Sequence, residues 1–385
     1  MTATGNNPIF TIEKEFGQSI WMDNLTRDLI QSGELKQMIE NRGLRGLTSN
    51  PSIFEKAIVG NAMYDADIEA GINASKSVQE IYESLVFEDI RNACDIFRPI
   101  YEESNGLDGY ISIEVPPNIA HDPDKTFEEA KRYYSEIGRE NVMIKIPGTS
   151  KGLPAVEKVI AEGINVNITL LFSVDSYVET AWAYIRGLEA RAAKGEDISK
   201  IASVASFFLS RIDINIDERI DQKLTAGVDR MEKKAKLEAV KGKIAIANAK
   251  IAYQKYKEIV QTDRWKALAE KGANVQRLLW ASTSTKNPDY SDVMYVDELV
   301  GKDTVNTLPP ATIEACADHC DPGNRIESDV DKAYHLIESL KDPDIDINLD
   351  EVMAELLDEG IDKFVKPFES LMSSLESKVE HLATV

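Results

Sequence analysis

A lysine stands inside one of the most apolar stretches of the chain. In VMIKIPGTS, residues 142–150, Lys145 follows Val-Met-Ile and precedes a further Ile and then Pro-Gly. An apolar run of this length that ends in Pro-Gly is typical of a buried strand that leads into a turn. Burial removes water from an ammonium group and so favours the neutral amine, which is the nucleophilic form. Lys145 is therefore either a tolerated structural charge or an amine that reacts.

Polar side chains also stand at the ends of the other apolar stretches. In chain order they are Asp23, Thr48 and Asn50, Glu114, Lys145, Asn167 and Thr169, Ser206 and Arg211, Ser282, and Thr307. Singly, they have ordinary explanations: Asp23 and Asn50 would cap helices, and Glu114 would pair with Lys145. Together, an amine and two carboxylates that converge on one place are a poor structural device, because buried charge is costly. The set therefore favours a functional site, provided that the stretches are strands of one barrel.

Eight short apolar stretches alternate with longer charged ones. The segments between them, such as 76–104, carry apolar residues three and four positions apart, as amphipathic helices do. Strands that alternate with helices imply parallel pairing and right-handed crossovers, so eight such units predict a closed (β/α)8 barrel of the α/β class. A doubly wound open sheet is the alternative, but the residues after its first strand, DNLTRD at 23–28, contain no glycine for a phosphate turn. The expected strands are 19–24, 45–50, 109–115, 142–146, 164–172, 201–209, 276–282 and 304–308.

We expect one domain, 1–385, with two additions to the minimal barrel. Residues 212–275 are charged and rich in Ala and Lys, which predicts two or three helices with solvated outer faces between the sixth and seventh strands. The segment from about 335 to 385 predicts a C-terminal helical extension. Its apolar residues fall roughly on one stripe: Val352, Leu356, Ile361, Phe364, Phe368, Leu371 and Leu375.

Composition limits the partners. The 385 residues are 43% hydrophobic and carry a formal net charge of −22, which repels nucleic acid and anionic membranes. No stretch approaches the roughly 18 consecutive apolar residues of a membrane span. The first residues, MTATGNNPIF, lack the basic region and apolar run of a secretory signal. We therefore expect a cytoplasmic protein that binds neither nucleic acid nor membrane; a homo-oligomer stays open.

Two patterns hint at metal ligands but are incomplete. Cys316, His319 and Cys320 offer ligand types, yet no second half of a site follows. The acidic run 342–350 resembles a calcium loop, but it places Ile347 where that loop requires glycine. Three cysteines also cannot form a disulfide framework. We expect no metal site.

A reactive lysine is the chemistry that remains. The chain has neither a P-loop nor a G-x-G-x-x-G fingerprint. A desolvated lysine forms a Schiff base with a carbonyl, and the protonated imine withdraws electrons from the neighbouring C–C bond. Carboxylates would then move the protons. This pattern favours class I aldolase chemistry without a cofactor.

Several long motifs resemble those of transaldolases. GLTSNPSIFEKAI (46–58) is similar to their Thr-Ser-Asn-Pro segment, and VMIKIPGTSKGLPAV (142–156) to their Schiff-base lysine segment. INVNITLLFS (164–173) and SVASFFLSRID (203–213) resemble the two strands that follow. WASTSTKNPDYSD (280–292), with DTVNTLPPAT further on, resembles the long bacterial subfamily. The resemblance covers about residues 15–375.

The resemblance implies a (β/α)8 barrel of the non-oxidative pentose phosphate pathway. Such enzymes move a dihydroxyacetone unit from sedoheptulose 7-phosphate to glyceraldehyde 3-phosphate, which gives erythrose 4-phosphate and fructose 6-phosphate. Lys145 would form the imine, Asp23 would be the general acid/base of cleavage, and Glu114 would act with Thr169 through a water. The residues implied to bind or surround the dihydroxyacetone unit are Asn50, Asn167, Thr48, Ser206 and Phe208.

The resemblance also implies a phosphate site, with one departure. Arg211 matches the phosphate-binding arginine, whose guanidinium fork suits a dianion, and Ser282 matches a neighbouring ligand. The alternative for Arg211 is an ion pair with Asp213. Many shorter transaldolases carry a second arginine where this chain has Ser284. We expect Lys286 to replace it, since the loop after the seventh strand often binds phosphate; the alternative is an exposed loop lysine.

Two other functions stay open. A simple aldolase would use the same imine but release free dihydroxyacetone when no acceptor is present. A barrel that has lost catalysis would show damage at the strand ends, where Lys145, Asp23 and Glu114 are all retained. The sequence favours the transferase.

Overall fold

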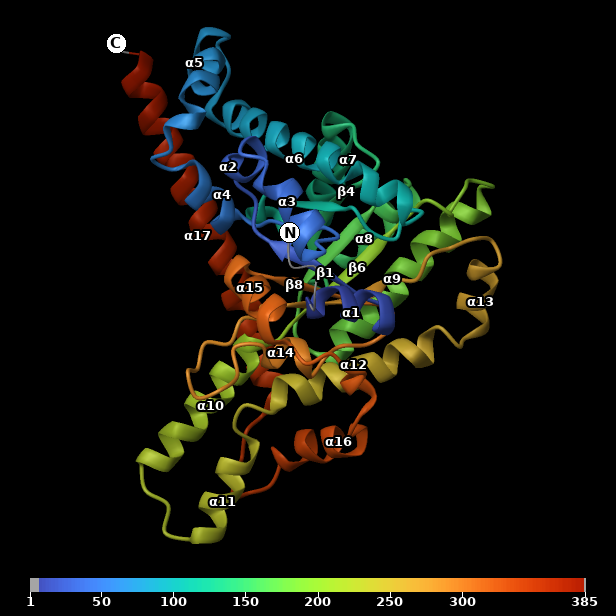
Figure 1. The fold of residues 1–385 in the computed structure, drawn as a ribbon, viewed down its shortest axis with the longest axis vertical. Coiled ribbons are helices and arrows are strands. Elements are labelled where there is room, and N and C mark those ends of the chain that lie inside the picture. Colours follow the sequence, from blue (N-terminus) through green and yellow to red (C-terminus); the bar gives the residue numbers. More distant parts are fainter. Residues whose placement is uncertain (1–6, 384–385) are drawn as a thin grey trace.

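Parallel strands form a closed barrel (Figure 1). The computed structural model describes residues 7–383, so most of the segment judged to lack a signal, residues 1–6, lies outside it. In the described range, eight strands follow one another around the barrel, and β1 pairs with β8 to close it. This confirms the (β/α)8 prediction and excludes the open sheet. The strands are β1 (Gln18–Asp23), β2 (Leu47–Thr48), β3 (Ile111–Glu114), β4 (Val142–Pro147), β5 (Val166–Leu171), β6 (Ser203–Phe208), β7 (Arg277–Ala281) and β8 (Thr304–Leu308).

The strand register brings the polar strand ends together. Glu114 pairs with Lys145, and Lys145 pairs with Asn167, across three adjacent strands. Asp23 of β1 pairs with Thr48 of β2. Strands of a parallel barrel are buried on both faces, which explains why they read as continuous apolar runs interrupted only by these polar residues.

Helices surround the barrel and begin at recognisable caps. The long helix α6 starts with a capping box, in which Ser77 and Glu80 bond to each other's backbone amides. Thr26 caps α2, so the helix-cap explanation for Asp23 is wrong. The helices outside the two additions are α1 (Pro8–Phe16), α2 (Arg27–Gln31), α3 (Glu34–Arg42), α4 (Pro51–Ile58), η1 (Ala62–Tyr64), α5 (Asp65–Asn73), α6 (Val78–Glu103), η2 (Pro117–Ile119), α7 (Pro123–Ile137), α8 (Leu153–Ala161), α9 (Val174–Ala193), α14 (Met294–Asp297) and α15 (Pro310–His319).

The insertion between β6 and β7 contains four helices, all within the described residues, rather than two or three. Gly227 and Gly242 separate the first three, with φ of +97° and +67°. Glycine adopts this left-handed region without the steric cost that other residues meet. The helices are α10 (Ser210–Thr225), α11 (Met231–Val240), α12 (Ile244–Ile259) and α13 (Asp263–Ala269).

Helix α12 is largely buried, which differs from the predicted solvated faces. It packs against α9 and against α16 (Val330–Ser339), a helix from a much later part of the chain. Two carboxylates of α10 hold its start: Asp213 accepts from the Ala245 amide and Asp217 from the Gly242 amide, both at 2.9 Å. Contacts with α16 cannot be read from the insertion's own sequence.

The C-terminal extension is one long helix, α17 (Leu349–Ala383), which follows η3 (Arg325–Glu327) and α16. It runs along one side of the molecule past α4 (Figure 1). The predicted stripe faces the protein, because Val352, Leu356, Phe364, Leu371 and Leu375 are buried and Ile361 and Phe368 pack against the core. Across residues 7–383, the structure contains no helix with both the length and the apolar character needed to cross a membrane.

A buried ionic cluster ties the barrel together at its N-terminal end. The Asp108 carboxylate accepts hydrogen bonds from the Ser19 hydroxyl at 2.8 Å, the Trp21 indole at 3.0 Å and the Arg277 guanidinium at 2.9 Å. Asp108 and Arg277 are almost fully buried. The cluster joins β1, β7 and the segment before β3, so it links different sides of the barrel.

We predict that Asp108→Ala lowers the free energy of unfolding by about 3–5 kcal/mol, because it leaves the buried Arg277 charge without its carboxylate. Denaturant titration of the purified variant measures this change. The control is Asp95→Ala, which removes an exposed pair with Arg139 and should cost less than about 1 kcal/mol. Equal losses in the two variants would contradict the role of the cluster.

Candidate active site

Lys145 lies in the interior of the barrel mouth. Its side chain comes from β4, the residue is 5% exposed, and Nζ donates a hydrogen bond to the Ser49 carbonyl at 3.1 Å. Ser49 belongs to the turn between β2 and α4. Among the described residues, this carbonyl is the hydrogen-bond partner of the amine, and it fixes the direction of the side chain.

Glu114 is the buried carboxyl beside it. Neither of its oxygens has a hydrogen-bond partner within residues 7–383, although the residue is only 7% exposed. Burial raises the pKa of Glu114 to about 7, and the charge of Lys145 opposes that rise. A carboxyl with this pKa exchanges protons readily near neutral pH, which suits general acid–base catalysis.

Asp23 stands at the rim of the same mouth. It accepts a hydrogen bond from the Thr48 hydroxyl at 2.8 Å, and Thr48 in turn lies 2.7 Å from the Thr307 hydroxyl. Burial raises the pKa of Asp23, while Lys145, the Thr48 hydrogen bond and Arg211 oppose the rise. The chain of two threonines orients the carboxyl.

A second hydrogen-bonded chain joins strands β6, β5 and β3. The Ser206 hydroxyl donates to Asn167 Oδ1 at 2.7 Å, and Asn167 Nδ2 donates to the Ser112 hydroxyl at 3.1 Å. Thr169, fully buried, has a hydroxyl with no partner in the described part of the chain. Its free hydroxyl and the free oxygens of Glu114 are groups that a substrate or a water would satisfy.

Asn50 has the ordinary role that the sequence left open. Its Oδ1 accepts from the Ile53 amide at 3.0 Å and so caps α4, with Pro51 at the first helical position. The cap uses the oxygen of the side-chain amide. Binding of a substrate hydroxyl by Asn50 stays a prediction.

Arg211 lies in the first turn of α10 and contacts Phe208, the last residue of β6. Its guanidinium carbon lies 5.2 Å from the centre of the Phe208 ring, and its Nη1 is buried with no partner among residues 7–383. Burial lowers the pKa of Arg211, opposed by the carboxylates Glu359 and Asp23. The expected alternative, a pair with Asp213, is absent from the described hydrogen bonds, since Asp213 accepts from Tyr295 and Ala245 instead.

Ser282 and Lys286 differ in how closely they approach this region. The Ser282 hydroxyl lies 2.9 Å from that of Ser210, next to Arg211 in sequence, and Ser282 has a φ of +55°. Lys286 is exposed, and its amine donates to the Ser284 hydroxyl at 2.7 Å.

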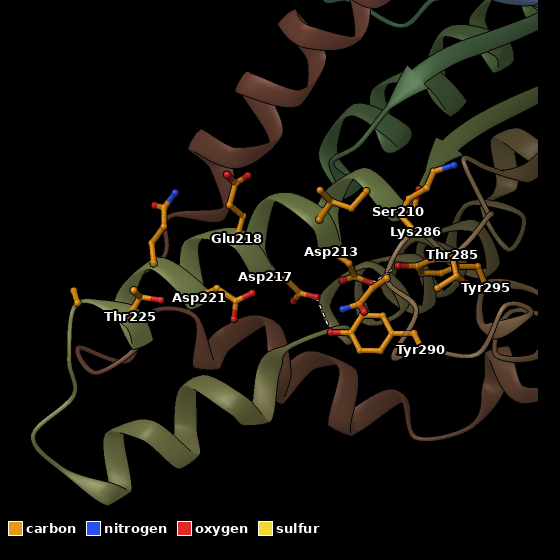
Figure 2. Close-up of a pocket in the computed structure, with 14 residues that line it drawn as sticks. Ser210, Asp213, Asp217, Glu218, Asp221, Thr225, Thr285, Lys286, Tyr290 and Tyr295 are labelled. Carbon is orange, nitrogen blue, oxygen red and sulfur yellow. Dashed lines mark hydrogen bonds between the residues drawn. The ribbon is translucent and has the colours of Figure 1, made fainter.

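Lys286 also borders a cavity of about 810 Å³ between α10 and the loop after β7. Figure 2 shows its amine directed away from Asp217 and Tyr290, which are joined by a hydrogen bond of 2.7 Å. This cavity therefore lies beside the barrel mouth, not within it. Among residues 7–383, no cluster of three or more His, Cys, Asp or Glu is arranged to hold a metal ion.

Sequence reasoning missed several groups that surround Lys145. Ser49 and Ser112 enter through hydrogen bonds that only the fold defines. Phe364 of α17 places its ring centre 5.7 Å from Lys145 Nζ. The amphipathic stripe predicted that Phe364 would be buried, but no local signal in the sequence indicated which residues it would pack against.

The fold and the site together define a (β/α)8-barrel enzyme with a buried lysine near two carboxyl groups. The family model described as Transaldolase/Fructose-6-phosphate aldolase matches residues 20–375. The chain belongs to this family and is an enzyme of the transaldolase type.

Relatives match over nearly the full length. A protein of Nostoc sp. named Transaldolase 2 is 72% identical over 97% of this chain and 98% of its own. A Transaldolase of Trichodesmium erythraeum is 72% identical over 98% of this chain and 99% of its own. A Transaldolase of Mycobacterium marinum is 42% identical, with the same coverage of 98% and 99%.

We predict that Glu114→Gln changes how stability depends on pH. The folded-state pKa, about 7, lies above the ordinary value of 4.5, so the folded protein holds this proton more tightly than the unfolded chain. The resulting stabilisation is complete below the unfolded pKa and is lost as pH rises through the folded one. The parent should therefore lose roughly 3 kcal/mol relative to Glu114→Gln across this window.

Urea unfolding of both proteins at pH values below and above this window measures the effect. Glu128→Gln, on the exposed face of α7, is the control and should differ from the parent by a constant amount. A pH-independent difference for Glu114→Gln would show that folding does not raise the pKa of this carboxyl.

Proposed function

We propose that the protein transfers a dihydroxyacetone unit from sedoheptulose 7-phosphate to glyceraldehyde 3-phosphate, giving erythrose 4-phosphate and fructose 6-phosphate, through a Schiff base on Lys145. The observation that carries the proposal is the buried Lys145 amine beside the unpartnered Glu114 carboxyl. Family membership and the names of the relatives support it. The reaction belongs to the non-oxidative pentose phosphate pathway.

The proposed first step builds the imine. Lys145 Nζ adds to the ketone carbon of the donor, and the resulting carbinolamine loses water. Glu114 protonates the departing hydroxyl through a water that Thr169 also binds, since both have free hydrogen-bonding atoms there. A carboxyl whose pKa is about 7 can give this proton and later take it back.

The proposed second step breaks and remakes the carbon–carbon bond. Asp23 takes the proton of the donor hydroxyl next to the bond, the bond electrons move to the iminium nitrogen, and the first aldehyde leaves. The enamine that remains attacks the carbonyl carbon of the acceptor aldehyde, whose oxygen takes the proton back from Asp23. Hydrolysis of the new iminium then frees the product and the Lys145 amine. Asn167 and Asn50 would hold the hydroxyls of the dihydroxyacetone unit, with Thr48, Ser206 and Phe208 around it.

The phosphate of donor and acceptor would lie at the β6–β7 side of the mouth. Arg211 offers a buried guanidinium nitrogen that lacks a partner within the described chain. The Ser282 hydroxyl contacts the hydroxyl of Ser210, the residue next to Arg211 in sequence. Lys286 would add a less directional charge from the loop. Arg211, Ser282 and Lys286 would thus set the distance between the substrate's phosphate and its reacting carbon.

One other function remains in view. The family description also names fructose-6-phosphate aldolase, which suggests release of dihydroxyacetone instead of transfer. Accumulation of free dihydroxyacetone without an acceptor distinguishes the two. An inactive barrel is disfavoured, because Lys145, Asp23 and Glu114 meet at one mouth.

We also propose that residues 1–385 form a single domain, since α12 packs on α9 and α17 packs on α4 and α6. The cytoplasmic location and a homo-oligomer stay predictions.

We predict that borohydride reduction with fructose 6-phosphate attaches a dihydroxyacetone mass to the peptide that contains Lys145. Reduction converts the imine to a stable amine, and peptide mass mapping locates it. Lys145→Arg should abolish the adduct, because a guanidinium does not form the imine. Lys151→Arg, exposed in the following turn, should keep it. An adduct absent from the folded parent, or found elsewhere, would refute the mechanism.

We predict that Arg211→Ala lowers kcat/KM for phosphorylated substrates by about 10- to 100-fold, the loss expected for a buried hydrogen bond to a charged group. Lys286→Ala should lower it by about two- to fivefold, since an exposed charge contributes up to about 1 kcal/mol. Steady-state kinetics at low and high salt measure both. Lys194→Ala, exposed at the end of α9, is the control. Unchanged kinetics for Lys286→Ala would leave it an ordinary loop lysine.

A further inference from the structure

Helix α17 lies across the C-terminal face of the barrel. Among its partners, α4 follows β2, η2 follows β3 and α10 follows β6, and it also contacts β5, α5 and α6. The first three begin directly after strand ends that carry polar site residues. Figure 1 shows α17 as a single rod that passes α4 and α10 on its way to the C-terminus. Helix α17 therefore covers the site.

Two positions on α17 make the closest approach. Phe364 is 4% exposed, and its ring centre lies 5.7 Å from Lys145 Nζ. Gly360, one helical turn earlier, leaves so little space that an added Cβ would lie 2.8 Å from Leu170 and 3.4 Å from Arg211 Nη1. Helix α17 thus lies against both the Lys145 amine and the Arg211 guanidinium. Phe364 covers the reacting end.

We propose that Phe364 determines whether the dihydroxyacetone unit is transferred to an acceptor or released as free dihydroxyacetone. Its ring does so by keeping water away from the carbon bound to Lys145. The inference rests on the proposed function and deepens it. The phenyl ring offers no hydrogen bond, so a water beneath it would lack partners on that side. Glu114 and Thr169 have free polar atoms that can hold the one water that imine chemistry needs.

The two fates of the enamine explain why water access matters. In transfer, the enamine carbon attacks the acceptor aldehyde, a new C–C bond forms, the new alkoxide takes back the proton held by Asp23, and the nitrogen becomes an iminium again. Water then adds to that iminium and the C–N bond breaks, which frees the longer product and the Lys145 amine. In release, the enamine carbon takes a proton, water adds to the iminium carbon, and the C–N bond breaks to give dihydroxyacetone and the free Lys145 amine. Extra water over the amine favours the second route.

We predict that Phe364→Ala raises the ratio of release to transfer by about tenfold, equivalent to about 1.4 kcal/mol in relative barrier height. Release is measured as free dihydroxyacetone from fructose 6-phosphate alone. Transfer is measured as sedoheptulose 7-phosphate formed after erythrose 4-phosphate is added. Phe364→Leu and Phe364→Val keep progressively less apolar cover, so the ratio should rise in the order Leu, Val, Ala. The series also provides an answer if the alanine variant does not fold.

Leu371→Ala is the matched control. Leu371 is a buried residue of the same helical stripe, two turns further along α17, so its loss loosens the helix without opening the space above Lys145. It should lower thermal stability and leave the ratio unchanged. A ratio that stays flat across the Phe364 series, or that rises equally in Leu371→Ala, would overturn the inference.

Borohydride trapping of the parent separates this failure from that of the proposed function. If the parent gives no adduct on Lys145, the Schiff-base mechanism fails and the inference with it. If the parent is trapped but the Phe364 variants keep the parental ratio, the mechanism stands and only the role of Phe364 is lost.

Discussion

The structure depends on holding an amine and a carboxyl side by side where water is scarce. Parallel pairing of β3 and β4 sets Glu114 against Lys145, and the register of the two strands fixes this neighbourhood. No hydrogen bond within residues 7–383 neutralises Glu114, so its proton affinity is governed by burial. Three groups surround this pair. The Ser49 carbonyl orients the amine, and the Asn167 amide occupies the neighbouring strand. Helix α17 excludes solvent.

Much of the fold could be predicted because barrel strands are short, apolar and regularly spaced. Every expected strand segment contains or overlaps a strand of the structure. The insertion was less predictable. Its helix count depends on backbone turns at Gly227 and Gly242, and the burial of α12 depends on α16, which lies far along the chain. Local periodicity shows that a face is apolar, but not which distant element will cover it.

The site residues could likewise be predicted only in part. Lys145, Glu114 and Asp23 could be found because charges at the ends of apolar runs are unusual, and the fold brings them to one mouth. Arg211 was expected to have Asp213 as an alternative partner, but Tyr295 and the start of α12 take that carboxylate. Phe364 shows the limit of sequence reasoning, since its contact with Lys145 joins the last helix to the fourth strand.

The two ends of the barrel solve the problem of buried charge in opposite ways. At the N-terminal end, Asp108 accepts hydrogen bonds from three side chains, so its charge is compensated and rigid. At the C-terminal end, Glu114, Thr169 and Arg211 have atoms left without partners in the described chain. Unsatisfied buried groups cost stability. The Asp108 cluster at one end helps the barrel to carry that cost at the other, and the substrate is what would satisfy the free groups of the site.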